Sequence, residues 1–532
     1  MLPYLIALVS GISMGLTVAP VGAWLLAWIA LVPLWVLVVT SAKGKNQFPP
    51  AFLWGIGYHG VALSWITGIH PMTWLGVPWL PSLVITLFCW GFISVLGGIF
   101  VAIWAAVMVR LVGQKPWLRV LIGTAFWCGL ESLWSAGPLW WSSLAYTQSP
   151  HNLVILHLGQ LSGPNNVTVA IVAFNGLIAE AYINRQEAKI SSVSRQLLQV
   201  GEPAQRTGFS APLRFVNKYL VIATGLLITL HLIGFILYSR PIAQLPEAAL
   251  KVGIVQGNIP NRLLRSSEGF RRAQENYTNG YLTLADQGVD AVLTPEGALP
   301  IFQRNLMDTA LVSAVKKKGV VAWIGAFGER GDSYTISLFT FNSKGEIVSR
   351  YDKSKLVPLG EYIPFEEILG GIVQRLSPLE AHQVPGSPNQ VFDTPFGRAI
   401  ASICYESAFP EQFRRQAAAG GQFILSSSND AHYSASMPFQ HHAQDIMRAI
   451  ETDRWSARAT NTGYSAFVDP HGKTLWISEY NTYEIHAETI YRRQTQTLYV
   501  RWGDWLTPLL LISSGGAYLL IQLSHTKKIS DY

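Results

Sequence analysis

Three side chains of complementary chemistry lie at strand ends in the second half of this 532-residue chain. Glu296 ends an apolar run, Lys353 stands where the chain leaves a hairpin, and Cys404 follows another apolar run. A cysteine nucleophile needs a base to take its proton and a cation or hydrogen-bond donors to hold the developing oxyanion. We therefore interpret these residues as a candidate catalytic group, in which Lys353 is expected to favour the thiolate and lower the pKa of the thiol.

Each of these residues also has an ordinary structural explanation. A Glu after a strand is often a solvated loop residue, an isolated Lys is often exposed, and a free Cys is often a small buried apolar side chain. Cys404 has no disulfide partner in its own segment, because Cys89 and Cys128 lie in strongly apolar stretches. The joint occurrence of the three residues, in this order, favours the catalytic interpretation.

Three histidines offer a rival base, as in a Cys–His dyad: His432, His441 and His442. They are explained more simply as one loop histidine and two helix histidines bonded to neighbouring groups, and the Glu and Lys leave no vacant role for them. The sequence has no HExxH motif, no CxxC pair and no Gly-rich phosphate loop. We therefore expect no metal and no cofactor.

The composition is typical of a membrane protein. Hydrophobic residues make up 50% of the chain and charged residues 13%, whereas a soluble protein carries about 25% charged residues. We expect eight spans, two within residues 1–40 and one in each of six apolar stretches: 51–69, 83–109, 120–139, 167–183, 219–238 and 505–523. The expected domains are a membrane domain of seven helices (1–240), a polar domain (241–500) and an eighth helix with a tail (501–532).

The positions of Lys and Arg predict the orientation in the membrane. Basic residues follow the second, fourth, sixth and eighth expected spans, whereas the loops at 70–82 and 140–166 contain none. Since basic loops stay in the cytoplasm, both termini are expected there and residues 241–500 outside. The net charge of +7 mostly reflects these loops, so nothing in it indicates a nucleic-acid partner.

The polar region reads as a layered α/β domain, in which strand-like and helical runs alternate. The expected strands are 251–256, 289–294, 320–327, 336–342, 398–404, 422–427 and 464–469. The expected helices are 305–318, 411–419 and 438–458. The chemistry is expected at the strand ends.

The order of Glu296, Lys353 and Cys404 resembles the catalytic triad of the nitrilase (carbon–nitrogen hydrolase) superfamily. The segment 351–364, YDKSKLVPLGEYIP, resembles more narrowly the signature of bacterial apolipoprotein N-acyltransferases. Cys404-Tyr405-Glu406 and the segments 448–451 and 458–463 are also similar to that family. The resemblance covers essentially the whole chain and implies eight spans, with a nitrilase-like α-β-β-α sandwich between the seventh and the eighth.

The resemblance also implies a reaction. An acyl chain would pass from a membrane phospholipid to Cys404 as a thioester, and then to the α-amino group of the diacylglyceryl-cysteine of a lipoprotein. Glu296 would be the base and then the acid, and Lys353 would stabilise the oxyanion. Glu361, Tyr405 and Glu406 match supporting residues of the family. We expect a monomer in the bacterial inner membrane, with its catalytic domain on the periplasmic side.

Two other functions remain open at this point. A membrane-anchored amidase would release the acyl group to water, although one span would suffice as its anchor. A scaffold or transporter with an inactive fold would not need the three residues. We also interpret the apolar residues of 365–373 as a candidate membrane-touching flap, and note that His432 stands where the family has Trp.

Overall fold

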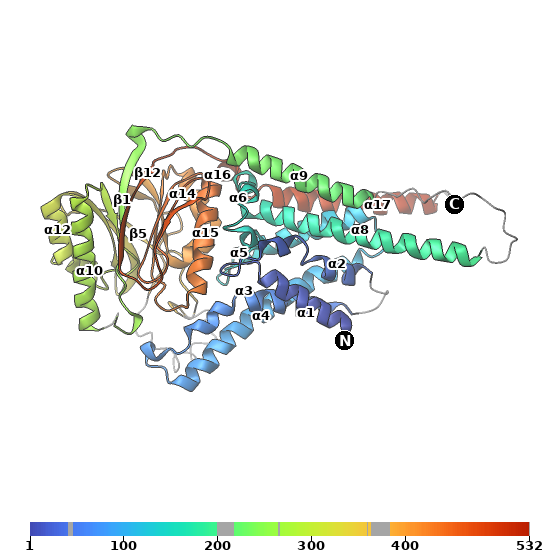
Figure 1. The fold of residues 1–532 in the computed structure, drawn as a ribbon, viewed down its shortest axis with the longest axis horizontal. Coiled ribbons are helices and arrows are strands. Elements are labelled where there is room, and N and C mark those ends of the chain that lie inside the picture. Colours follow the sequence, from blue (N-terminus) through green and yellow to red (C-terminus); the bar gives the residue numbers. More distant parts are fainter. Residues whose placement is uncertain (41–45, 199–216, 264–265, 359, 363–382, 531–532) are drawn as a thin grey trace.

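The computed structural model describes residues 1–40, 46–198, 217–263, 266–358, 360–362 and 383–530. A helical part and a two-sheet part lie end to end along the long axis of the molecule (Figure 1). The chain begins in the helical part, crosses into the sheets after residue 238, and returns for its last helix.

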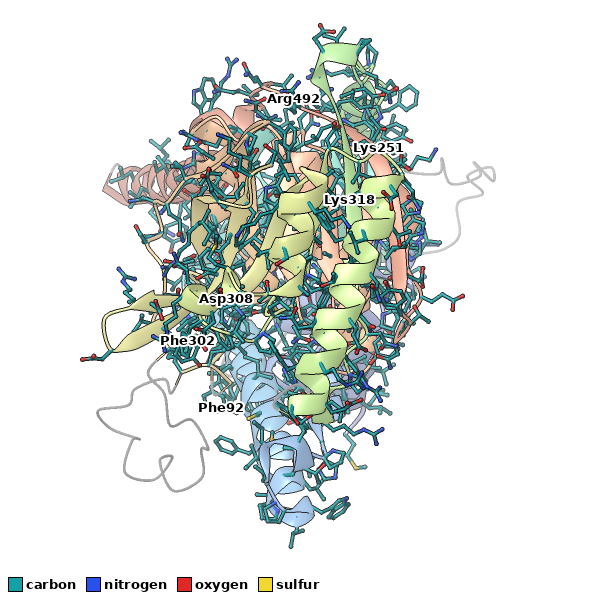
Figure 2. The ribbon with its side chains drawn as sticks, turned by 90° about the vertical axis from the view of Figure 1, so that its left-hand side faces the viewer. Phe92, Lys251, Phe302, Asp308, Lys318 and Arg492 are labelled. Carbon is teal, nitrogen blue, oxygen red and sulfur yellow. The ribbon has the colours of Figure 1, made fainter. Side chains whose placement is uncertain are left out.

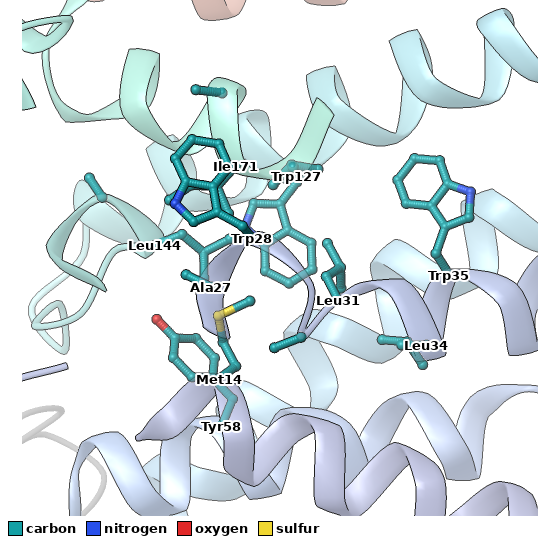
Figure 3. Close-up of a cluster of buried hydrophobic side chains, with 14 of the residues drawn as sticks. Met14, Ala27, Trp28, Leu31, Leu34, Trp35, Tyr58, Trp127, Leu144 and Ile171 are labelled. Atoms are coloured by element: carbon teal, nitrogen blue, oxygen red, sulfur yellow. The ribbon is translucent and has the colours of Figure 1, made fainter. Parts of the chain in front are cut away.

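The helical part contains eight helices of eight residues or more within the described residues. They are α1 (Leu2–Gly15), α2 (Val32–Val39), α3 (Phe48–Ala62), α4 (Trp79–Arg110), α5 (Pro116–Ser135), α8 (Pro164–Leu198), α9 (Lys218–Tyr238) and α17 (Leu506–Ser530). Bulky side chains, among them Met14, Trp28, Trp35 and Trp127, interlock in its core (Figure 3).

By length and hydropathy, four helices of the described chain are able to cross a membrane. They are Trp79–Arg110, Pro164–Ile190, Lys218–Tyr238 and Leu506–Ser524. The other predicted spans fall on α5 and on the shorter α1, α2 and α3. A membrane-associated helical part is therefore supported, and the count of eight spans stays a prediction.

Small residues let α1 and α3 approach each other closely. Gly11 and Gly15 are four residues apart, so they share one face of α1. A Cβ at Gly11 would lie 2.1 Å from the carbonyl oxygen of Trp54, and a Cβ at Gly15 would lie 2.6 Å from Val61. This spacing of small residues is the pattern that packs helices in a membrane, where dispersion contacts replace the hydrophobic effect.

The second part is an α-β-β-α sandwich, as predicted. One six-stranded sheet has the order β12 (Glu484–Tyr491), β1 (Ala249–Gln256), β2 (Ala291–Leu293), β3 (Val321–Arg330), β4 (Ser333–Phe341) and β5 (Ile347–Asp352). The other has the order β11 (Thr474–Ile477), β10 (Ala466–Val468), β9 (Ser456–Thr460), β8 (Ile424–Ser428), β7 (Gly397–Ile403) and β6 (Phe392–Thr394). In both sheets three neighbouring strands are parallel and the outer ones antiparallel.

Helices cover the outer face of each sheet (Figure 1). The first sheet is covered by α10 (Ser267–Asp286) and α12 (Ala310–Lys318), and the short α11 (Gln303–Leu306) precedes α12. The far end of the sandwich is polar, with Lys251 and Lys318 at its surface (Figure 2). The second sheet is covered by α14 (Pro410–Ala418) and α15 (Ser436–Thr452). Apolar side chains from both sheets, including Trp323 and Leu425, fill the space between them.

The prediction of one helix over 438–458 is wrong at its end. The helix stops at Thr452, where Asp453 adopts a left-handed conformation with φ 56°, and the chain enters strand β9. The predicted helix over 305–318 is split, because Thr309 accepts a hydrogen bond from the N–H of Val312 and starts a new helix. The polar helix α10 and several short strands were not predicted.

Helix α15 joins the two parts of the molecule. Its residues Ile446, Met447 and Ile450 belong to the same apolar cluster as the helical part. The side chain of Gln444 donates to the carbonyl oxygen of Trp141 at 2.9 Å. The second sheet therefore packs against the helical part through α15, on the side of the sandwich that carries Cys404.

The close approach of α1 and α3 gives a stability prediction. Gly11→Ala places a methyl group against the backbone of Trp54, and overpacking of this kind costs about 1–3 kcal/mol. We expect a lower apparent Tm for the detergent-solubilised chain. The control is Gly225→Ala in α9, where the added Cβ meets nothing within 4 Å. Equal thermal stability of the two variants would contradict this packing.

Candidate active site

The fold brings Glu296 and Lys353 into direct contact. Glu296 lies just after β2, and Lys353 lies just after β5 of the same sheet. The Nζ of Lys353 is 2.8 Å from Oε1 of Glu296 and 2.6 Å from Oε1 of Glu361. The lysine side chain is fully buried, so its charge is balanced by these two carboxylates rather than by water.

The two carboxylates are themselves held by backbone groups. Oε2 of Glu296 accepts from the N–H of Asn429 at 3.0 Å, which links it to the loop after β8 in the other sheet. Oε2 of Glu361 accepts from the N–H of Val357 at 2.9 Å. Each carboxylate thus offers one oxygen to Lys353 and fixes its other oxygen on the chain.

Electrostatics keep the lysine charged. Burial lowers the pKa of Lys353, but the charges of Glu296 and Glu361 outweigh it, and the pKa is raised well above its usual value. For Glu361, burial and then the nearby Glu296 raise the pKa, although Lys353 opposes them. An ammonium group flanked by these carboxyl groups is a permanent cation at neutral pH.

Cys404 lies at a sharp turn between β7 and the short 3-10 helix η7 (Cys404–Ala408). Its φ is 52°, a left-handed conformation that costs roughly 1–3 kcal/mol in a residue other than Gly. Oε2 of Glu406 accepts from the N–H of Ile403 at 2.7 Å, and the carbonyl oxygen of Cys404 contacts Nε2 of His441 at 2.7 Å. These contacts hold the turn from both sides.

Glu406 connects the cysteine turn to the lysine loop. Its Oε1 accepts from the N–H of Ser354 at 2.6 Å and from the Ser354 hydroxyl at 2.7 Å, and its Oε2 accepts from the Tyr351 hydroxyl at 3.0 Å. Burial raises the pKa of Glu406, while the hydrogen bonds from Ile403 and Ser354 oppose the shift. Glu406 therefore has a positioning role between two loops, because each of its oxygens accepts from at least two groups, whereas each oxygen of Glu296 has one partner.

Lys353 lowers the pKa of the Cys404 thiol, as expected, but other effects are larger. Burial raises the pKa of Cys404 most, Glu296 and Asp430 raise it further, and Lys353 lowers it too little to compensate. The pKa of the thiol is well above its usual value, so the prediction of a lowered pKa was wrong. A protonated thiol needs a base during the reaction, and the carboxylate of Glu296 is close enough for its charge to act on the thiol.

Tyr405, the residue after the cysteine, contacts the helical part. Its hydroxyl lies 2.6 Å from the carbonyl oxygen of Pro138 and 2.8 Å from that of Trp140. Its ring is nearly parallel to that of Trp141, with 8° between the planes. An apolar cluster surrounds this contact: Leu63, Ile93, Trp140, Trp141, Tyr405, Ala408, Phe409 and Met437. The cysteine turn is thus pressed against the apolar helical part rather than exposed to water.

The histidines do not form a Cys–His dyad. Nδ1 of His441 lies 2.7 Å from a guanidinium nitrogen of Arg458, which can only donate, so its lone pair is occupied. His442 contacts Thr474 at 2.9 Å, and burial lowers its pKa to about 4. His432 stacks on Trp74 of the helical part, with 4.2 Å between ring centroids. The structure therefore supports the simpler explanation of these residues.

One group of potential metal ligands occurs among the described residues. Cys404, Asp430 and His441 each offer an atom within 4.8 Å of the others. The group is poorly suited to a cation, because both ring nitrogens of His441 are engaged and the Arg458 guanidinium is 3.3 Å from Asp430. The sequence analysis gave no role to Asp430 or Arg458. The candidate flap at 365–373 lies outside the described residues.

Comparisons with known proteins identify two family domains in this chain. Residues 251–497 match the carbon–nitrogen hydrolase family, and residues 10–177 match the apolipoprotein N-acyltransferase N-terminal domain. An apolipoprotein N-acyltransferase of Nostoc sp. is 73% identical over 503 residues, which cover 94% of this chain and 95% of the relative. One of Synechocystis sp. is 46% identical and covers 95% and 98%. A solved amidase from Nesterenkonia sp. matches 48% of this chain and 94% of its own, with 20% identity and a TM-score of 0.35.

The raised pKa of the thiol predicts how Cys404 reacts with iodoacetamide. Alkylation is expected to rise with pH without a plateau below pH 9, because the neutral thiol dominates there. Glu296→Gln removes a charge that disfavours the thiolate, so alkylation at pH 8 should become about 3- to 10-fold faster. Labelling is followed by intact mass, with Cys404→Ala as the background.

The matched control is Glu275→Gln, an exposed carboxylate on α10. It should leave the alkylation rate unchanged. Slower alkylation in Glu296→Gln would show that the carboxylate promotes the thiolate in the resting site, contrary to the geometry described here.

Proposed function

The chain belongs to the apolipoprotein N-acyltransferase family, and we propose that it transfers a fatty acyl chain from a membrane phospholipid to a lipoprotein. The acyl group passes through a thioester on Cys404 to the α-amino group of the N-terminal diacylglyceryl-cysteine. The nucleophile in this proposal is Cys404, the base and acid is Glu296, and the oxyanion is held by Lys353.

One structural observation supports this proposal in addition to the family match. The turn that holds Cys404 is packed against the apolar helical part through Tyr405, Trp140 and Trp141. A phospholipid ester and a diacylated cysteine both lie at the surface of a bilayer. The position of the thiol at this boundary supports substrates that remain in the membrane.

In the first step, Glu296 takes the proton of the Cys404 thiol as sulfur attacks the ester carbonyl. The oxygen that becomes negative is held by the Lys353 ammonium and the N–H of Tyr405, which lies in the first turn of η7, where N–H groups lack intrahelical partners. The tetrahedral intermediate then collapses. The C–O bond of the ester breaks, the proton on Glu296 goes to the leaving lysophospholipid, and the acyl group remains on sulfur.

In the second step, the neutral α-amine of the lipoprotein attacks the thioester carbonyl. Glu296 takes a proton from the nitrogen, the same donors hold the oxyanion, and the C–S bond breaks. The proton returns to the sulfur as Cys404 leaves, which regenerates the neutral thiol that burial favours. Glu361 and Glu406 support the two loops, and Tyr405 anchors the turn to the helical part.

The topology belongs to the same proposal. Eight spans with cytoplasmic termini leave residues 241–500 on the periplasmic side of the inner membrane, between a membrane domain at 1–240 and a last helix within 501–532. The distribution of Lys and Arg supports this orientation. The enzyme acts as a monomer in this proposal, since one chain supplies all the named side chains.

The first test is intact mass spectrometry of the full chain in detergent with added phospholipid. A hydroxylamine-labile mass gain equal to one acyl group is expected, and Cys404→Ala should lack it. The adduct should disappear when a diacylated lipopeptide is added, and the lipopeptide should gain the acyl group. Loss of the adduct to water with no acylated lipopeptide would favour the amidase alternative, and no adduct on the folded chain would contradict the proposal.

A second prediction concerns the anchor of the turn. Tyr405→Phe keeps the ring on Trp141 but removes the hydroxyl that contacts two buried carbonyl groups. Leaving a buried polar group unsatisfied costs about 1–3 kcal/mol, so acyl transfer from phospholipid should slow by roughly 5- to 150-fold if the whole cost falls on the transition state. Tyr483→Phe, which removes an exposed hydroxyl that contacts the carbonyl oxygen of Asn276 on α10, is the control. An unchanged transfer rate in Tyr405→Phe would show that the anchor has no part in catalysis.

A further inference from the structure

A chain of buried polar side chains ends on the backbone of Cys404. Arg458 of β9 lies 2.5 Å from Oδ2 of Asp445 and 3.3 Å from Oδ2 of Asp430. A guanidinium nitrogen of Arg458 lies 2.7 Å from Nδ1 of His441, and Nε2 of His441 lies 2.7 Å from the carbonyl oxygen of Cys404. All five residues are at least nine-tenths buried. The mechanism described above uses only the last of them.

The partners of His441 determine where its proton lies. A carbonyl oxygen only accepts, so Nε2 of His441 must carry a hydrogen. Arg458 only donates, so Nδ1 must present its lone pair. Oδ1 of Asp430 is 3.5 Å from Nδ1, which is long for a charge-assisted hydrogen bond. Nε2 of His441 is therefore the donor directed at the carbonyl group of Cys404, and Nδ1 is the acceptor for Arg458.

The carbonyl group of Cys404 and the N–H of Tyr405 belong to one peptide unit. This unit is trans and planar, so the two groups point in opposite directions. A side chain that holds the oxygen also fixes the direction of the N–H on the other side. Donation to the oxygen polarises the amide as well, and strengthens its N–H as a donor.

We propose that His441 is a positioning residue for the oxyanion hole: it holds the Cys404 carbonyl group and thereby directs the Tyr405 N–H at the oxyanion. Arg458 orients the ring, and Asp430 and Asp445 hold Arg458. The inference rests on the proposed function only for the role of Cys404 as nucleophile. It explains why a buried cation with two carboxylates lies beside the cysteine although none of them reaches the substrate in the mechanism.

The test compares two reactions of Cys404 in the full detergent-solubilised chain. Acylation by p-nitrophenyl butyrate passes through an oxyanion, whereas alkylation by iodoacetamide is a displacement that forms none. His441→Leu should slow acylation by about 100-fold, the loss found when one oxyanion donor is removed, and leave alkylation within a factor of about three. His441→Gln, which can still donate to the carbonyl group, should recover acylation to within about 10-fold of the unsubstituted chain.

The matched control is His442→Leu, because His442 is the next residue of α15 and is buried but contacts Thr474 instead of Cys404. It should retain both rates. Equal losses of acylation and alkylation in His441→Leu would overturn the proposal, since they indicate a collapsed site or a role in forming the thiolate. No loss of acylation would also overturn it, as would an equal selective loss in His442→Leu.

The proposed function can fail independently of this inference. The unsubstituted chain is tested with phospholipid in parallel, and the absence of a thioester there would contradict lipid acyl transfer. The comparison of His441→Leu, His441→Gln and His442→Leu with the soluble ester would still decide the role of His441.

Discussion

The rest of the site depends on the ion pairs that the buried ammonium group of Lys353 forms with two carboxylates. A charge without water must be matched by nearby opposite charge, and Glu296 and Glu361 supply it at 2.8 and 2.6 Å. Removing one partner of a buried ion pair costs about 3–5 kcal/mol, because the other charge is left uncompensated. The ends of β2 and β5 and the loop that carries Glu361 must therefore converge on one point.

The same arrangement determines the state of the cysteine. Burial, together with the carboxyl groups around the ammonium, raises the pKa of the thiol and leaves it neutral. In the proposed mechanism the thiol is therefore neutral at rest, and Glu296 takes its proton only as sulfur attacks the substrate carbonyl. Glu406 and His441 hold the strained turn, and Tyr405 joins it to the helical part. The candidate nucleophile and the contact with the helical part thus lie on one short segment of chain.

Much of this molecule could be predicted from local patterns in its sequence. The parallel strands β2 and β7 are continuous apolar runs, and Glu296 and Cys404 follow them, so these strands and residues were found; Lys353 was found although the antiparallel strand β5 before it was not predicted. The helix α10 was missed because its residues are mostly polar, and the end of α15 was misplaced because one left-handed residue, Asp453, starts a new strand. The sign of the thiol pKa was wrong, because burial could not be weighed against Lys353 without the fold.

The sequence by itself determined the family, the membrane character and the identity of the candidate nucleophile, base and cation, because these depend on residue type, order and local apolar runs. Only the tertiary structure decided what each side chain touches. Asp430, His441, Asp445 and Arg458 come from a loop, a helix and a strand, and their pairing exists only where α15 is packed between the second sheet and the helical part. Hydrogen bonds and charge balance act over a few ångströms in space, and the sequence does not contain those distances.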